Sequence, residues 1–164
     1  MSTFVRIVGS LFVAVSLFVT LRPAASAAGT LDLIRPEQEV LTILNQARSD
    51  SAAPAPQLDV VLTAIARSRS TDMAARHYFS HYTPEQTTFF DLLNDSGTTW
   101  NYAGETITRN NYDDSDASTV AAQTLLASPR HRAVILDPQY NTVGIGHAVD
   151  HQGMHYYTVI FVRR

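Results

Sequence analysis

The sequence predicts an α+β fold in a single domain. Helical periodicity dominates the chain from Pro36 onward, alternating strand patterns come late, and the last third reads as a hairpin closed by the turn "DHQG". Helices that precede a terminal antiparallel hairpin are typical of domains in which helices cover an antiparallel sheet. The 164 residues, 45% of them hydrophobic, are enough to bury a sizeable core.

The helices are predicted from apolar spacing and from their start and stop signals. Pro36 occupies the first turn of the first helix, and the break "SDSAAPAP" ends it. Pro84 ends the second helix region, and Asp137-Pro138 stops the last one. After the first helix, further helices are predicted from Leu58 to about Phe79, at "TTFFDLLND", over Thr119–Leu126 and from Ser128-Pro129 to Leu136.

Three strands are predicted in the second half of the chain. "GETIT" at Gly104–Thr108 is a short apolar strand. Around residues 143–149, apolar side chains alternate with glycine and alanine, and Met154–Val162 forms the second arm of the hairpin.

The first 27 residues differ from the rest. Arg6 precedes a 15-residue apolar run, Ile7–Leu21, and "ASA" at Ala25–Ala27 has the form of a signal-peptidase site. We expect a cleaved signal peptide at 1–27, a lead-in at 28–35 and one domain at 36–164. An uncleaved N-terminal anchor is the alternative, although the apolar run is short for a membrane span. After cleavage we expect no stable membrane span.

Composition excludes several classes of function. Removal of residues 1–27 takes away two arginines and no acid, which moves the formal charge from −3 to about −5. A mildly acidic domain does not suit nucleic acid, whose binding depends on basic side chains at phosphates. The chain has no cysteine, so disulfides, thiolate ligands and a thiol nucleophile are excluded.

Two histidines lie four residues apart in "RHYFSHYTPE". On one helix face, His77 and His81 could hold a metal ion together. However, Tyr78 stands where an HExxH metalloprotease motif needs glutamate, and Pro84 places His81 at or past the helix end. We therefore expect His77 to be a partly buried structural residue, separate from His81.

Glu105 opens a short apolar strand, where a partly buried carboxylate needs a partner or a shifted pKa. From the local pattern alone, a solvated glutamate on an edge strand is the favoured interpretation, and the partly buried carboxylate is the alternative. His131 lies between two arginines in "SPRHRAVIL", and we expect it and Ser128 to have structural, capping roles.

The last histidines lie on the predicted hairpin. His155 shares a strand face with Tyr157 and Phe161 by alternation, and it is a candidate ligand if that face borders a cleft. His147 and His151 flank the turn and are expected to be solvated.

Together these motifs resemble the CAP superfamily, the cysteine-rich secretory, antigen 5 and pathogenesis-related proteins, in its bacterial SCP-like extracellular branch. "LNQAR", "DMAARHYFSHYTPE", "AGETI", "SPRHRAVIL", "VGIGHAV" and "HYYTVIF" follow in the family order from Glu37 to Phe161. The resemblance implies an α-β-α sandwich with a small antiparallel sheet and a central cleft.

In many members that cleft holds two histidines and two glutamates, which in some bind zinc or another divalent cation. Carried over by motif, His81 is the first histidine, Glu105 the first glutamate and His155 the second histidine. No acid stands near Ala127, where the second glutamate is expected, and Thr106 replaces the usual asparagine. The expected metal set is therefore His81, Glu105 and His155 with water.

The resemblance implies an exported protein, in the periplasm or outside the cell. The favoured function is a non-enzymatic binding or interaction module, whose His/Glu cleft accepts a small ligand, lipid, peptide or cell-envelope component. The alternative is a zinc-dependent hydrolase with Glu105 as ligand or base. A third interpretation is a buried polar network that only fixes the core. No catalytic residue is assigned.

Overall fold

A computed structural model describes residues 31–164, so the predicted signal peptide lies outside the described residues. The helices are α1 (Arg35–Asp50), α2 (Val60–Arg76), α3 (Phe89–Asp95), α4 (Ala117–Ala127) and α5 (Pro129–Leu136). The strands are β1 (Gln57–Leu58), β2 (Tyr102–Asn110), β3 (Thr142–Val149) and β4 (His155–Arg163). Within residues 31–164, no helix has the length and apolar character needed to cross a membrane.

The four strands form one sheet in the order β1-β3-β4-β2. The hairpin strands β3 and β4 pair antiparallel, β2 joins β4 antiparallel, and β1 joins β3 parallel. In this register Glu105 lies opposite Ile160, and Asn110 lies opposite His155. The register therefore decides which candidate site residues can meet.

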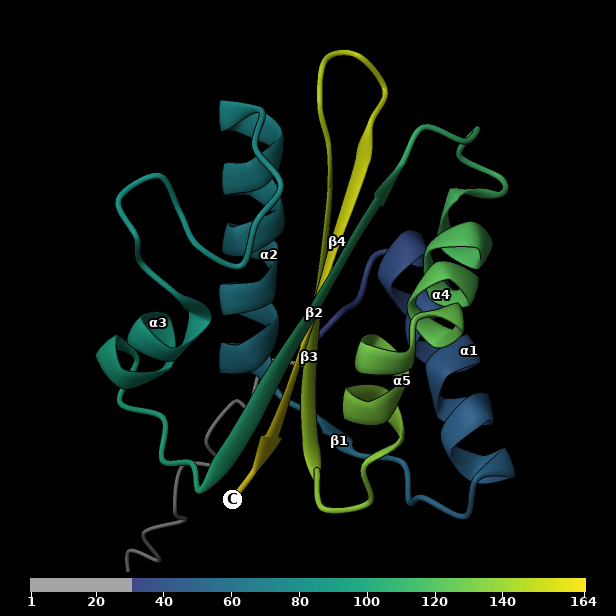
Figure 1. The fold of residues 1–164 in the computed structure, drawn as a ribbon, viewed down its shortest axis with the longest axis vertical. Coiled ribbons are helices and arrows are strands. Elements are labelled where there is room, and N and C mark those ends of the chain that lie inside the picture. The colour runs from purple at the N-terminus through teal and green to yellow at the C-terminus, as the bar shows by residue number, and fades with distance from the viewer. Residues whose placement is uncertain (1–30) are drawn as a thin grey trace, which may run out of the picture. The chain divides into compact units, whose positions relative to one another are not determined.

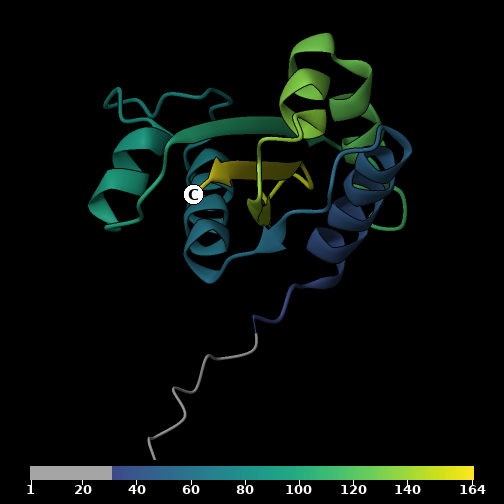
Figure 2. The same cartoon turned by 90° about the horizontal axis from the view of Figure 1, so that it is seen from below.

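Helices cover both faces of the sheet, as Figures 1 and 2 show. Tyr157, Val159 and Phe161 of β4 pack with residues of α1, α4 and α5, whereas Ile160 and Val162 pack with α2 and α3. This division follows from the alternation of side chains along a strand. The predicted α+β fold, an α-β-α sandwich, is confirmed.

Two glycines let α2 lie directly on β3. A Cβ at Gly144 would collide with the backbone of Leu62 and Thr63, and one at Gly146 with the backbone of Ala66 and Arg67. The alternation of glycine with apolar residues in "VGIGHAV" therefore serves helix–strand contact. It also fixes α2 on the face of the sheet to which Glu105 belongs.

Arg48, at the end of α1, is fully buried. Its guanidinium donates hydrogen bonds to the carbonyl oxygens of Pro54, Ile135, Asp137 and Tyr140, at 2.5–3.2 Å. Burial lowers its pKa, against the smaller raising effect of the charge of Asp137. One side chain thus joins the loop after α1 to α5 and to the segment before β3.

The structure corrects three local predictions. Leu58 belongs to the two-residue strand β1 rather than to the second helix, which begins at Val60 behind the N-cap Asp59. Asp59 accepts a hydrogen bond from the backbone N–H of Leu62. The helix ends at Arg76 rather than near Phe79, and its C-cap His77 has a left-handed φ of 54° and a half-exposed side chain.

Candidate functional site

The site starts from Glu105, whose side chain is only 1% exposed. Because Glu105 lies opposite Ile160, its side chain points to the α2 face of the sheet. A carboxylate buried there needs charged or hydrogen-bonding partners. The solvated glutamate that the local pattern favoured is therefore wrong, and the alternative of a partly buried carboxylate agrees with this placement.

Each carboxylate oxygen of Glu105 has its own partner. Arg69 of α2 places Nε 3.1 Å from Oε1, and its side chain is also 1% exposed. His81 places Nδ1 2.6 Å from Oε2. Since an ionised carboxylate only accepts hydrogen bonds, this contact requires a proton on Nδ1 of His81, and Nε2 is the ring nitrogen that Glu105 does not engage.

Arg69 also holds the chain segment that carries His81. Its guanidinium donates to the Tyr78 hydroxyl at 2.9 Å and to the Ser80 carbonyl oxygen at 2.7 Å. The Tyr78 hydroxyl in turn donates to Asp72 at 2.6 Å. Burial, and then the hydrogen bond to Asp72, raises the pKa of Tyr78 to about 12. The buried guanidinium of Arg69 therefore fixes the segment after α2 that carries His81.

The His81 ring lies at the surface of this network. Its side chain is 47% exposed, whereas the carboxylate behind it is buried. A buried carboxylate that accepts from Nδ1 fixes the orientation of an imidazole, as it does for histidines in catalytic and metal sites. The arrangement presents one oriented nitrogen, Nε2, to whatever contacts this surface.

His131 lies near His81 in the structure. The sequence had predicted a structural, capping role for it. Burial lowers its pKa, and the nearby charge of His81 lowers it further. Within the described residues its Nδ1 is buried without a hydrogen-bond partner, so it caps nothing. Ser128 takes the N-cap position of α5, but its side chain makes no capping hydrogen bond. The sequence signal for this residue was the histidine between two arginines in "SPRHRAVIL".

The structure does not bring His155 to this site. Five residues of β4 separate it from Ile160, the partner of Glu105, which is about 17 Å at the usual rise per residue. An odd separation also turns its side chain to the opposite face of the sheet. Instead, the Nδ1 of His155 lies 3.0 Å from the Nε2 of His147, and its Nε2 lies 3.3 Å from the Oδ1 of Asp114.

The expected metal set of His81, Glu105 and His155 is therefore not assembled. Across residues 31–164, no group of three or more His, Cys, Asp or Glu side chains is arranged to hold a metal ion. The expectation failed because it took the second histidine from the last strand, where alternation and distance both separate it from Glu105.

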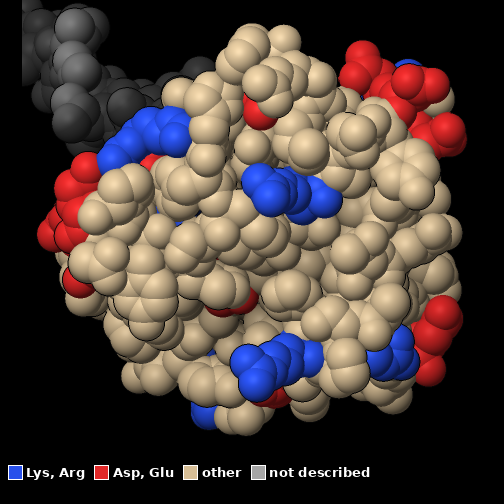
Figure 3. All heavy atoms as spheres, turned by 45° about the horizontal axis from the view of Figure 1, so that its top comes forward, with Lys and Arg blue, Asp and Glu red and all other residues tan. Residues whose placement is uncertain are grey.

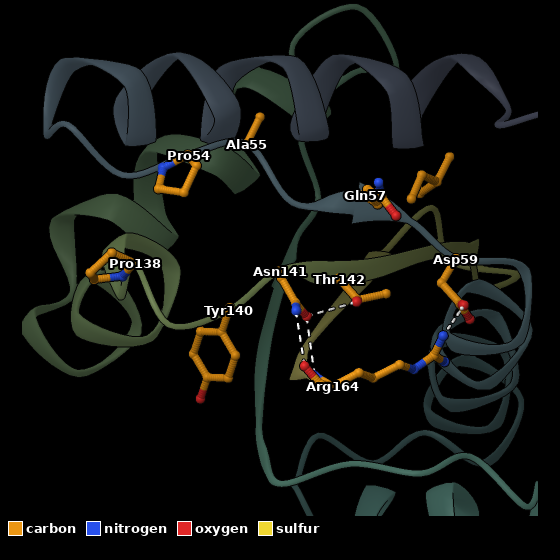
Figure 4. A pocket seen from close by; sticks show the side chains of 10 residues that line it. Pro54, Ala55, Gln57, Asp59, Pro138, Tyr140, Asn141, Thr142 and Arg164 are labelled. Atoms are coloured by element: carbon orange, nitrogen blue, oxygen red, sulfur yellow. Dashed lines mark hydrogen bonds and ion pairs between the residues drawn. The ribbon is translucent and has the colours of Figure 1, made fainter.

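A cavity of about 460 Å³ lies elsewhere, beside β1 (Figure 4). Its two charged side chains, Asp59 and Arg164, pair with each other at 2.8 Å. Asn141 bonds the backbone of Arg164. The cavity is lined mainly by proline, amide and hydroxyl side chains and holds none of the candidate site residues.

Charge is dispersed over the face shown in Figure 3, and no continuous basic patch appears there among the described residues.

The fold and the site together define the class of protein, an α-β-α sandwich in which a carboxylate on the sheet pairs with a histidine from the segment after α2. The chain belongs to the CAP family, described as the Cysteine-rich secretory protein family, whose model matches residues 41–161. The predicted resemblance is confirmed.

Individual relatives agree with the family. The chain is 28% identical over 111 residues to the uncharacterized protein YkwD of Bacillus subtilis strain 168, a match that covers 68% of this chain and 42% of YkwD. A solved extracellular protein containing an SCP domain, from Bacillus anthracis strain Ames, has a TM-score of 0.68 at 28% identity, covering 79% of this chain and 40% of that one. An outer surface protein of Borrelia burgdorferi has a TM-score of 0.72 at 13% identity, covering 82% of this chain and 96% of that one, and shows the fold alone.

Proposed function

We propose that this chain is an extracytoplasmic binding module whose ligand surface is centred on His81. The observation that carries the proposal is the bond of His81 to a buried Glu105 that is itself held by Arg69. A preorganised, half-exposed imidazole can recognise a polar group at low entropic cost, because its orientation is set before the ligand arrives.

The geometry favours binding over catalysis. Both oxygens of Glu105 are already engaged, so this carboxylate is poorly placed to activate water. Within the described residues, His81 makes no hydrogen bond to a serine or threonine hydroxyl, which a nucleophilic mechanism requires. The hydroxyl of Ser80, the neighbouring residue, accepts from the backbone of Tyr82 instead.

The side chains next to His81 in the chain indicate the ligand class. Phe79 is 39% exposed and Tyr82 is 54% exposed, so both rings offer apolar surface to a ligand. Arg109 lies over the Phe79 ring, with its guanidinium carbon 5.0 Å from the ring centroid. A polar nitrogen, a cation and exposed aromatic rings suit an amphipathic anion such as a fatty acid.

An extracytoplasmic location has two supports. The sequence predicts a signal peptide at residues 1–27, outside the described part of the chain. The similar Bacillus anthracis protein is extracellular by its own description.

Fluorescence titration with a fluorescent fatty acid tests the proposal. We expect saturable binding by the protein, about tenfold weaker binding by His81→Ala, and unchanged binding by the control His151→Gln, which lies in the β3–β4 turn. Circular dichroism checks that each variant is folded. Absence of saturable binding, or equal affinity for His81→Ala and the unaltered protein, would contradict the proposal.

A further inference from the structure

His77 lies at a position where the backbone favours another residue. It ends α2 with a φ of 54°, the left-handed conformation that glycine or asparagine usually supplies at a helix end. Its backbone N–H bonds the carbonyl oxygen of Met73. Histidine is one of the non-glycine residues that adopt this conformation more often than others, and half of the His77 side chain is exposed.

The His77 ring meets a second imidazole from a distant part of the sequence. His151, in the turn between β3 and β4, places its ring centroid 4.8 Å from that of His77, with the ring planes at 77°. Two imidazoles that bind one zinc ion have centroids about 5 Å apart, because each Zn–N bond is about 2.1 Å. The observed spacing therefore fits a shared cation.

A buried carboxylate stands behind this pair. Asp150 Oδ2 lies 3.7 Å from His77 Nδ1, and its side chain is 4% exposed. The backbone N–H groups of Gln152 and Met154 donate to Oδ1, and the Tyr156 hydroxyl donates to Oδ2. A carboxylate facing Nδ1 favours the tautomer whose Nε2 is free to bind metal, as in the carboxylate–histidine–zinc arrangement.

There is also room for an ion and its water. A hollow of about 290 Å³ is lined by His77, Asp150 and His151. The small side chains of Thr71, Ala74 and Ala75 form the α2 side of this hollow.

We propose that His77 and His151 form a surface site for one transition-metal ion that prefers imidazole, such as Zn²⁺, Ni²⁺ or Cu²⁺, with Asp150 orienting His77 and water completing the coordination. The site has only two protein nitrogens, which agrees with the finding that no three-residue metal group exists within residues 31–164. Its affinity is therefore expected to be lower than that of zinc sites with three or four protein ligands.

Metal binding would join the end of α2 to the tip of the β3–β4 hairpin. The segment that leads from α2 to His81 begins at this same residue, His77. The site is distinct from the proposed ligand surface, because His77 contacts His151 and Asp150 whereas His81 contacts Glu105.

Calorimetric titration of the untagged protein with ZnCl₂ at pH 7.5 tests the proposal. We expect one equivalent to bind, and His77→Asn and His151→Gln each to weaken binding about tenfold or more. Asparagine tolerates the left-handed conformation, so His77→Asn preserves the helix end. The control His81→Asn should bind zinc like the unaltered protein.

Electron paramagnetic resonance of the Cu²⁺-loaded protein gives a second measurement, and we expect nitrogen coupling from two imidazoles that is reduced in either variant. Absence of zinc binding at millimolar concentration overturns the proposal. So does loss of binding in His81→Asn with full binding in His77→Asn, since that result places the ion at the other histidine. Neither outcome bears on fatty-acid binding, which is measured separately.

Discussion

His81 and Glu105 are joined by a 2.6 Å contact between Nδ1 and Oε2, although 24 positions separate them in the chain. The contact places a half-exposed imidazole on a carboxylate that solvent does not reach. Arg69 balances the charge of that carboxylate from the other side. The stability of the site and its surface chemistry therefore depend on the same buried pair.

Glu105→Gln should strongly destabilise the fold. The substitution leaves the guanidinium of Arg69 buried without its counter-charge, and breaking a buried ion pair in this way costs about 3–5 kcal/mol. Urea unfolding at pH 7 measures the loss. The control Glu85→Gln, which breaks the surface pair with Arg76, should have a much smaller effect. Equal losses in the two variants would show that the buried pair does not stabilise the fold.

Gly146→Ala should destabilise the contact between α2 and β3. The added Cβ meets the backbone of Ala66 and Arg67, which cannot move aside as a side chain can, so we expect a loss of about 3 kcal/mol. The comparison is Gly153→Ala, where nothing lies within 4 Å and only the strain of a positive φ remains, about 1 kcal/mol. Thermal unfolding followed by circular dichroism should rank them in this order, and the reverse order would refute the close-contact explanation.

Stability should fall in mild acid because of His147. Burial, and then the charge of His155, lowers the pKa of His147 to about 4. The unfolded chain takes up this proton near pH 6.5 and the folded protein only near pH 4. The contribution is therefore complete above pH 6.5 and is lost as the pH falls toward 4. The full shift corresponds to about 3 kcal/mol, and because the side chain is partly exposed, screening by solvent reduces the expected loss to about 2 kcal/mol. His131, whose pKa is also lowered, adds to the loss with the same sign.

Urea unfolding at pH 7.0, 5.5 and 4.0 measures this dependence. His147→Gln should have a flatter profile between pH 6.5 and 4 than the unaltered protein. The same slope in both proteins would assign the pH dependence to other groups.

Arg48→Met should destabilise the protein by at least about 3 kcal/mol, because hydrogen bonds to charged groups contribute about 1.5–3 kcal/mol each. Removal of the guanidinium leaves several buried carbonyl oxygens without a donor. Arg163→Met removes one exposed hydrogen bond to Gln139 and serves as the control. Urea unfolding that found the two variants equally stable would contradict the role given to Arg48.

The sequence was sufficient to predict most of the fold, because helix starts, proline stops and strand alternation are local signals. The strand β1 was missed because two residues, Gln57 and Leu58, carry no periodicity, and only the parallel pairing with β3 defines them. The left-handed end of α2 at His77 was missed for a related reason, since no glycine or asparagine marks it.

The site was predictable only in part. His81 and Glu105 lie in separate motifs whose family order brings them together, and that expectation agrees with their contact. Arg69 had no local signal, because its function comes from facing β2 across the α2–sheet contact. His155 was assigned to the site wrongly, because strand alternation places its side chain on the face opposite to Glu105. The proximity of His131 to His81, which lowers the pKa of His131, depends on tertiary packing and has no local signal.

The buried guanidinium of Arg48 has a consequence for a cysteine-free protein that is expected to work outside the cytoplasm. Its hydrogen bonds join segments about 90 positions apart, the span over which a small secreted domain would often use a disulfide. Unlike a disulfide, this cross-link needs no oxidant to form and no isomerase to correct it. The fold is therefore expected to be insensitive to thiol reductants and to form equally well before and after export.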